Sequence, residues 1–189
     1  MIAFFLGDLI VQLIVRLCFA GLFAVGVRHK IADLDAFRRT LWAYEILPKT
    51  WVRAAGTAIV VFEGATGLAA LFAPPFVAAA AVSGLLLAYT TAISVNVARG
   101  RRDIDCGCGG PELYQRLGPA LIVRNVALLV AGSSLFVTPV SRSLHWLDAV
   151  TVFACVAAAA LAWQSIERLL VAQNSMHSSW ASRALERQI

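Results

Sequence analysis

The chain has 189 residues, of which 60% are hydrophobic and 14% are charged. A soluble domain carries about a quarter charged residues, so this composition excludes an ordinary water-soluble globular protein. The net charge of +5 comes from basic residues that flank apolar segments, where they orient spans and contact lipid, so we expect a lipid bilayer and no nucleic acid as partner.

Five apolar segments are long enough to cross the roughly 30 Å of hydrocarbon in a bilayer as helices. They are 4–27, 51–73, 76–98, 119–137 and 146–170. The first lacks a preceding basic stretch and a following small-residue cleavage site, so we expect a span and not a signal peptide. The sequence therefore predicts an all-α, multi-pass helix bundle over 1–170, followed by a loose C-terminal tail over 171–189.

Between the first two spans, the sequence predicts a short amphipathic helix over 33–47. Apolar residues recur at helical spacing from Leu34 to Tyr44, Asp33 is a favourable N-cap, and Pro48 ends the helix. Such a helix lies on the membrane surface, or it is an ordinary connector between spans. The pattern does not choose between the two.

Most Lys and Arg residues fall on one side of the predicted bundle. With five crossings, 28–50, 99–118 and the tail share that side and carry nearly all the basic residues outside the spans. The positive-inside rule places this side in the cytoplasm.

The loop after the third span is the segment most typical of chemistry. It reads Asp105-Cys106-Gly107-Cys108-Gly109-Gly110. The glycines give the backbone unusual freedom, and a disulfide across one residue departs from relaxed geometry and is easily reduced. We therefore predict that Cys106 and Cys108 cycle between dithiol and disulfide.

Neighbouring charges bear on this thiol chemistry. Arg99, Arg101 and Arg102 favour the thiolate, and Asp103 and Asp105 partly oppose them. Two other interpretations of the loop stay open. One is a metal site that uses both thiolates with Asp105 or a histidine, although complete zinc sites usually have four ligands at recognisable spacings. The other is a static tight loop.

Two further cysteines lie inside predicted spans. Cys18 and Cys155 are each about ten residues from the ends of their segments. A lone cysteine in such a place usually packs as a small hydrophobic side chain. We expect packing, with a role as resolving thiol as the alternative.

Two charged side chains, Glu63 and Arg124, fall within the second and fourth spans. Each costs about 2.5–3.5 kcal/mol near a helix centre, so we expect both to face the bundle interior, where they can pair. Asn96 and Arg99 lie one turn apart near the end of the third span. These four residues are predicted to form a polar pocket beneath the cysteines, or a structural ion pair with a capping asparagine.

Several of these motifs resemble a known family. The first half resembles the DoxX-like membrane proteins at Lys30, Phe37, Tyr44-Glu-Ile-Leu-Pro48, Glu63 and Gly67. The second half is specifically similar to the MauE family of methylamine utilisation membrane proteins at Asn96-Val-Ala-Arg99-Gly100, Asp105-Cys106-Gly107-Cys108 and Arg124-Asn125. The resemblance extends to about residue 170, and Gly109 departs from it where an aromatic residue is expected.

The resemblance implies a thiol-disulfide oxidoreductase or maturation factor in the bacterial inner membrane. It would help to mature the disulfide-rich small subunit of methylamine dehydrogenase, alongside the thioredoxin-like protein MauD. Analogy with quinone-linked disulfide-generating proteins implies a membrane quinone as electron acceptor, although the sequence shows no quinone site. A non-catalytic assembly factor that presents a client protein is the alternative class.

The resemblance and the charge pattern disagree about the membrane face. Methylamine dehydrogenase matures outside the cytoplasm, whereas the basic residues place Cys106 and Cys108 inside. Either the bundle exposes its thiols on both faces, or the charge rule fails here, or one predicted span does not cross.

Overall fold

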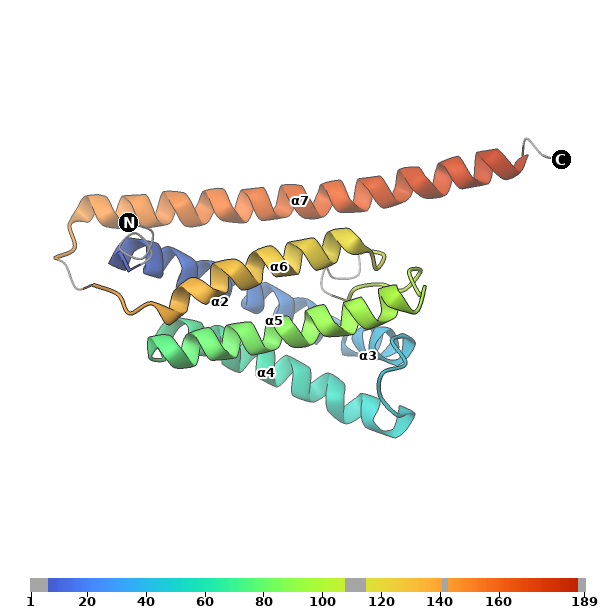
Figure 1. Cartoon of the computed structure of the whole chain (residues 1–189), viewed down its shortest axis with the longest axis horizontal. Coiled ribbons are helices and arrows are strands. Elements are labelled where there is room, and N and C mark those ends of the chain that lie inside the picture. Colours follow the sequence, from blue (N-terminus) through green and yellow to red (C-terminus); the bar gives the residue numbers. More distant parts are fainter. Residues whose placement is uncertain (1–6, 108–114, 141–142, 187–189) are drawn as a thin grey trace.

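The computed structural model describes residues 7–107, 115–140 and 143–186 (Figure 1). Five long helices lie side by side: α2 (Leu9–Ala32), α4 (Val52–Phe72), α5 (Pro75–Ala98), α6 (Pro119–Ser133) and α7 (Trp146–Glu186). Each of them, with the short 3-10 turns that extend α4 and α6, is long and apolar enough to cross a bilayer. The predicted all-α membrane bundle is confirmed, and the chain is a multi-pass membrane protein.

The first span lies about one turn later than predicted. Asp8 lies before α2 as its N-cap, and its carboxylate accepts a hydrogen bond from the Ile10 backbone N–H at 2.8 Å. The helix continues to Ala32 and so includes Lys30, which the sequence analysis assigned to the following loop. The predicted end at residue 27 is therefore wrong.

The short helix α3 (Leu34–Ala43) confirms the expected element between the first two spans. Asp33 caps it, accepting from the Ala36 N–H at 2.7 Å. The helix ends at Ala43, so the predicted end at residue 47 before Pro48 is wrong. The backbone has already left the helical conformation at Glu45, which adopts a positive φ of 48°. A 3-10 turn, η1 (Lys49–Trp51), then leads into α4.

A tight turn joins α4 to α5, as the consecutive prolines predict. Pro74 precedes α5, and Pro75 is its first residue. A proline costs no hydrogen bond at this position, because the N–H of the first helical residue has no partner within the helix. Arg16 of α2 donates to the carbonyl oxygens of Ala70 and Ala73, both at 3.0 Å. This side chain therefore satisfies carbonyls that the end of α4 leaves open.

Most of the buried apolar residues form two clusters. The first includes Phe19, Phe23, Ala70, Ala79, Val82, Leu86 and Leu135, from α2, α4, α5 and the 3-10 turn η2 (Ser134–Phe136). The second comprises Tyr44, Ile93, Cys106, Leu117 and Leu121. The second cluster therefore packs directly around one cysteine of the CxC loop.

The last helix is much longer than predicted. Its 41 residues span about 60 Å at 1.5 Å per residue, and it extends past the rest of the bundle (Figure 1). The expected loose tail is thus helical as far as Glu186. Residues 171–186 contain neither Gly nor Pro, the two residues that most disfavour a helix interior.

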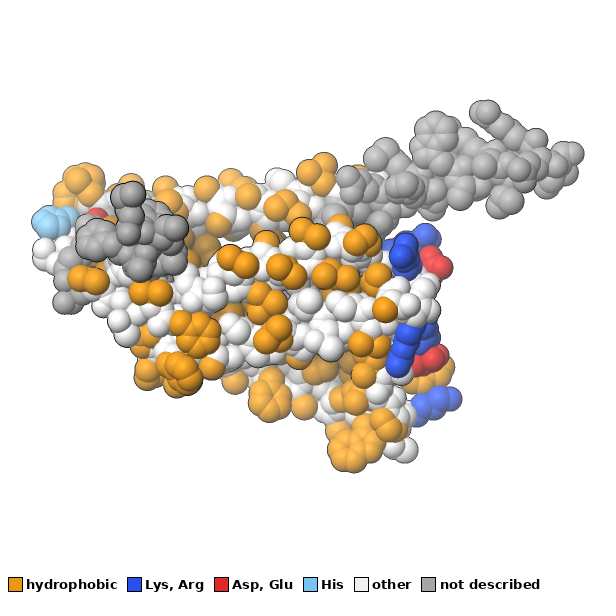
Figure 2. Space-filling model, in the orientation of Figure 1, with side chains coloured by type: hydrophobic (Ala, Val, Ile, Leu, Met, Phe, Trp, Pro, Cys, Tyr) orange, Lys and Arg blue, Asp and Glu red, His pale blue; other side chains and the backbone are white. Residues whose placement is uncertain are grey.

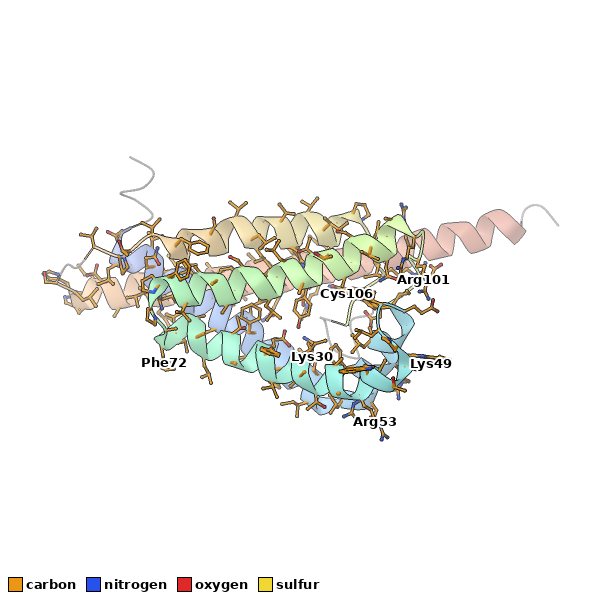
Figure 3. All side chains as sticks on the ribbon, turned by 60° about the horizontal axis from the view of Figure 1, so that its bottom comes forward. Lys30, Lys49, Arg53, Phe72, Arg101 and Cys106 are labelled. Carbon is orange, nitrogen blue, oxygen red and sulfur yellow. The ribbon has the colours of Figure 1, made fainter. Side chains whose placement is uncertain are left out.

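Basic residues gather at one end of the bundle, and apolar side chains cover its flanks (Figure 2). Lys49, Arg53 and Arg101 lie at the same end as Cys106, whereas Phe72 lies at the opposite end (Figure 3). This end, which we call the loop end, is the side on which the sequence placed the positive charge.

Candidate functional site

Short backbone contacts close the base of the cysteine loop. The Cys106 N–H donates to the Gln115 carbonyl at 2.8 Å, and the Leu117 N–H donates to the Ile104 carbonyl at 3.0 Å. Asp105 and Arg116 form an isolated antiparallel bridge between these two bonds. The chain therefore leaves and re-enters the loop at one fixed place. Cys108, the other predicted redox residue, lies outside the described residues.

Cys106 is buried at the loop end of the bundle. Its exposed fraction is 7%, and it packs with Tyr44, Leu117 and Leu121. The Tyr44 hydroxyl donates to the Cys106 carbonyl oxygen at 3.2 Å. The connection after α3 therefore holds the cysteine in place, which explains why Tyr44 is buried although no residue of α3 itself is.

Asp105 organises the loop backbone. Its Oδ1 accepts from the Gly107 N–H at 3.3 Å and from the Gln115 N–H at 3.2 Å. Gly107 has a φ of +73°, and a Cβ there would lie 3.1 Å from the Thr40 side chain. The residue between the two cysteines therefore needs to be glycine both for its conformation and for its space.

The nearby arginines tie the loop end together. Arg101 forms an ion pair with Glu45 at 2.8 Å, and Arg99 donates to the Glu45 carbonyl at 3.5 Å. Arg116 pairs with Asp103 at 3.4 Å. These contacts connect the loop with the turn after α3, and the predicted stabilisation of a thiolate by Arg99 stays a prediction.

Asn96 is fully buried near the end of α5. Its Nδ2 donates to the Ala92 carbonyl at 3.1 Å, and its own carbonyl accepts from the Arg101 N–H at 3.0 Å. Its side-chain oxygen has no hydrogen-bond partner among the described residues. Asn96 thus helps to end α5 where the loop begins.

The expected pairing of Glu63 with Arg124 is wrong. Glu63 of α4 pairs with Lys30 of α2 at 2.6 Å, and their side chains are only 5% and 3% exposed. The Lys30 ammonium also lies 5.4 Å from the Phe37 ring centroid and 5.5 Å from that of Tyr89. The first two helices therefore share an ion pair inside the bundle, surrounded by aromatic rings.

The packing of α2 against α4 makes room for this pair at Gly26. A Cβ at that position would lie 2.6 Å from the Glu63 Oε1. Phe19, Phe23, Gly26 and Lys30 follow one another at intervals of three or four residues, so they share one face of α2. All four are buried. This spacing is the signal that could have assigned Lys30 to the bundle interior.

A small pocket of about 60 Å³ connects this region with the cysteine loop. Its lining comes from the end of α2, from α3 and from the loop: His29, Lys30, Asp33, Ala36, Phe37, Thr40, Asp105 and Gly107. Of the four residues expected to form one polar pocket, none lines it. The buried cation that does so is Lys30.

Arg124 of α6 belongs to a second buried polar group. Its Nη1 lies 3.3 Å from the Gln115 side-chain oxygen and 3.7 Å from the Glu167 carboxylate of α7. Its guanidinium carbon is 5.1 Å from the Trp163 ring centroid. Arg124 was predicted from the sequence because it is a charge within a span, whereas nothing in a single sequence distinguishes Gln115 from any other polar loop residue.

The other cysteines and possible metal ligands can be placed as well. Cys18 and Cys155 are free, on α2 and α7. Among the residues whose side chains the structure describes, no three His, Cys, Asp or Glu side chains come together as a metal site would require.

Together these features define a class of protein: a multi-pass helical membrane protein that holds a buried cysteine in a closed loop at one end of its bundle. The family model of the methylamine utilisation protein MauE matches residues 8–139. The chain therefore belongs to the MauE family, whose members take part in methylamine utilisation.

Individual relatives agree with this assignment. The chain is 32% identical over 128 residues to the methylamine utilization protein MauE of Paracoccus denitrificans, covering 65% of this chain and 69% of the relative. It is 30% identical over 157 residues to MauE of Methylophilus methylotrophus, covering 82% of each. MauE of Paracoccus versutus is 34% identical over 110 residues, which is 58% of this chain and 59% of the relative. No solved structure matches the chain.

Proposed function

We propose that the protein is a membrane thiol-disulfide oxidoreductase that uses Cys106 and Cys108 to form or reshuffle disulfides in a partner protein. The observation that carries this proposal is the fixed position of Cys106 at the edge of the bundle. Backbone contacts to Gln115 and Tyr44 hold it, and Gly107 turns the chain with a positive φ directly between the two cysteines. A purely structural loop has no need of one thiol on each side of such a turn.

The exchange step needs no group beyond the thiols and a partner disulfide. One cysteine thiolate attacks the partner's disulfide, forms a mixed disulfide and releases a partner thiolate. The second cysteine then attacks the mixed disulfide, which gives a Cys106–Cys108 disulfide and a fully reduced partner. Two electrons and two protons pass to the partner, and the reverse sequence oxidises it.

The burial of Cys106 suggests how the two roles divide. At 7% exposure, Cys106 suits the resolving thiol better than the thiol that first meets a protein partner. Cys108 then makes the first attack. The partner is a thioredoxin-like protein, and the client is a disulfide-rich protein such as the small subunit of methylamine dehydrogenase.

The test is client maturation in cells that carry cysteine variants. Cys106→Ser and Cys108→Ser should each abolish maturation, while Cys18→Ser and Cys155→Ser, the matched controls inside the spans, should leave it intact. Cys106→Ser should also accumulate a mixed disulfide with the partner, seen on a non-reducing gel. Normal maturation in the Cys106→Ser/Cys108→Ser variant would exclude the oxidoreductase.

The exposed aromatic residues at the loop end favour a scaffold as the second candidate. Trp42 is 52% exposed and Trp51 is 65% exposed, which suits a surface that contacts a client or lipid. A scaffold would tolerate loss of both cysteines but lose function with Trp42→Ala. Phe37 and Tyr44 are poor test positions, because both contact the cysteine loop.

A further inference from the structure

The helix α7 is the least buried of the five spans. It packs chiefly against α2, and no residue in the most apolar part of its Trp146–Leu169 segment is buried. Glu167 is an exception among its neighbours, because its side chain is only 14% exposed and pairs with Arg124 of α6. A carboxylate at this depth needs a counter-ion, so the ion pair fixes α7 to α6 at one point.

The same arginine also contacts the cysteine loop. Arg124 donates to the side-chain oxygen of Gln115, which is fully buried. The backbone of Gln115 in turn accepts from the Cys106 N–H and donates to the Asp105 carboxylate. The contacts therefore run without a break from α7 through Glu167, Arg124 and Gln115 to Cys106.

We propose that Arg124 is a positioning residue that fixes Cys106 through Gln115, and that Glu167 of α7 holds Arg124 in place. The inference rests on the thiol role proposed above for Cys106. Among the described residues, the Gln115 amide nitrogen and the Arg124 Nε have no hydrogen-bond partner. The hydrogen bond between the two side chains is thus the side-chain contact that orients Gln115 within the described part of the chain.

This series of contacts from Glu167 to Gln115 controls how accessible the Cys106 thiol is to an attacking reagent. While Gln115 is held, Cys106 stays in its apolar cluster, and a reagent reaches the thiol only after a local opening that moves Cys106 out of that cluster. Release of Gln115 makes that opening easier. Loss of one hydrogen bond to a charged group corresponds to about a tenfold change in such an equilibrium.

The experiment isolates Cys106 as the single thiol in the full-length protein in detergent. The parent protein carries Cys18→Ala, Cys108→Ser and Cys155→Ala, and the rate of Cys106 alkylation by a maleimide is measured under native conditions. Gln115→Leu removes the side-chain oxygen that accepts from Arg124. Gln115→Glu keeps an acceptor oxygen and adds a negative charge that attracts the Arg124 guanidinium. We expect about tenfold faster alkylation with Gln115→Leu and the parent rate with Gln115→Glu.

Glu167→Gln extends the test to α7. This substitution touches no loop residue, so a faster Cys106 reaction would report coupling along the chain of contacts. It should be at least threefold faster, and Glu167→Gln combined with Gln115→Leu should be no faster than Gln115→Leu alone. Equal rates for the Leu and Glu variants of Gln115, or an unchanged rate in Glu167→Gln, would overturn the proposal. Far-UV circular dichroism and the unfolding temperature confirm that each variant is folded.

A separate measurement keeps this proposal distinct from the proposed function. Disulfide exchange is followed in the protein with its native cysteines, using oxidised glutathione as the probe. If exchange is absent but the two Gln115 variants differ in alkylation, the positioning role stands and the oxidoreductase fails. If exchange occurs but the alkylation rates are equal, the positioning role fails alone.

Discussion

Removal of one partner of the Lys30–Glu63 ion pair should destabilise the bundle strongly. The two charges are 2.6 Å apart and 95% or more of each side chain is shielded, so either residue alone would be an uncompensated charge. Breaking such a buried pair costs about 3–5 kcal/mol. Glu63→Gln and Lys30→Met should each lose this much free energy of unfolding.

The double variant separates pairing from burial. Lys30→Met/Glu63→Leu removes both charges and leaves side chains of similar size, and such replacements are often neutral or stabilising by about 1–4 kcal/mol. The double variant should therefore be at least as stable as the wild type, although each single change is severe. This strong non-additivity is the signature of direct contact.

The assay is reversible unfolding in mixed detergent micelles, followed by far-UV circular dichroism. The matched control is Asp35→Asn, which breaks the exposed Arg38–Asp35 pair, whose carboxylate is 78% exposed. That change should cost less than about 1 kcal/mol. A loss below about 1 kcal/mol in Glu63→Gln, or a double variant as unstable as the sum of its parts, would refute the reasoning.

Three further predictions concern the loop end. Gly107→Ala should destabilise the loop by about 1–2 kcal/mol, because its φ of +73° and the 3.1 Å approach to Thr40 both disfavour a Cβ. Hydrogen exchange at the Cys106 N–H should become faster, whereas Gly84→Ala, where a Cβ would lie in open space, should leave it unchanged. Tyr44→Phe removes the hydrogen bond to the Cys106 carbonyl and should cost about 1 kcal/mol, measured as faster alkylation of Cys106 with the bundle still folded. The basic residues at the loop end predict that a membrane-impermeant maleimide labels Cys106 and Cys108 in inverted vesicles and not in intact cells; labelling in intact cells would show that the charge rule fails here.

Hydrophobic length and helix-breaking residues predicted most of the fold. The cap at Asp33 is a local feature, so the sequence alone located it. The first span was displaced, because Asp8 is polar enough to cap the helix while the apolar run begins before it. Lys30 was assigned to a loop because a charge near the end of a span is normally at the surface.

The candidate site was only partly predictable. The sequence placed Asp105 and Cys106 in the loop after the third span, and the chemical role that it predicted for them stays a prediction. It did not show that Asp105 accepts backbone N–H groups, because that depends on the return of the chain at Gln115, ten residues later. Contacts between segments that are distant in sequence, such as that of Tyr44 with Cys106, produce no periodic pattern in the sequence and so cannot be predicted from it.

The charges inside the membrane show the limit of a single sequence most clearly. Three of the cations on the spans have partners inside the bundle, and each is satisfied differently: Arg16 by helix-end carbonyls, Lys30 by Glu63, and Arg124 by Glu167. Successive residues of a helix are 100° apart, so pairing depends on how each helix is rotated about its axis. Gly26 decides that rotation for α2, because its missing side chain lets α4 bring Glu63 against the same face that carries Lys30. Because Glu63 is already paired with Lys30, Arg124 needs another carboxylate, and Glu167 of α7 supplies it.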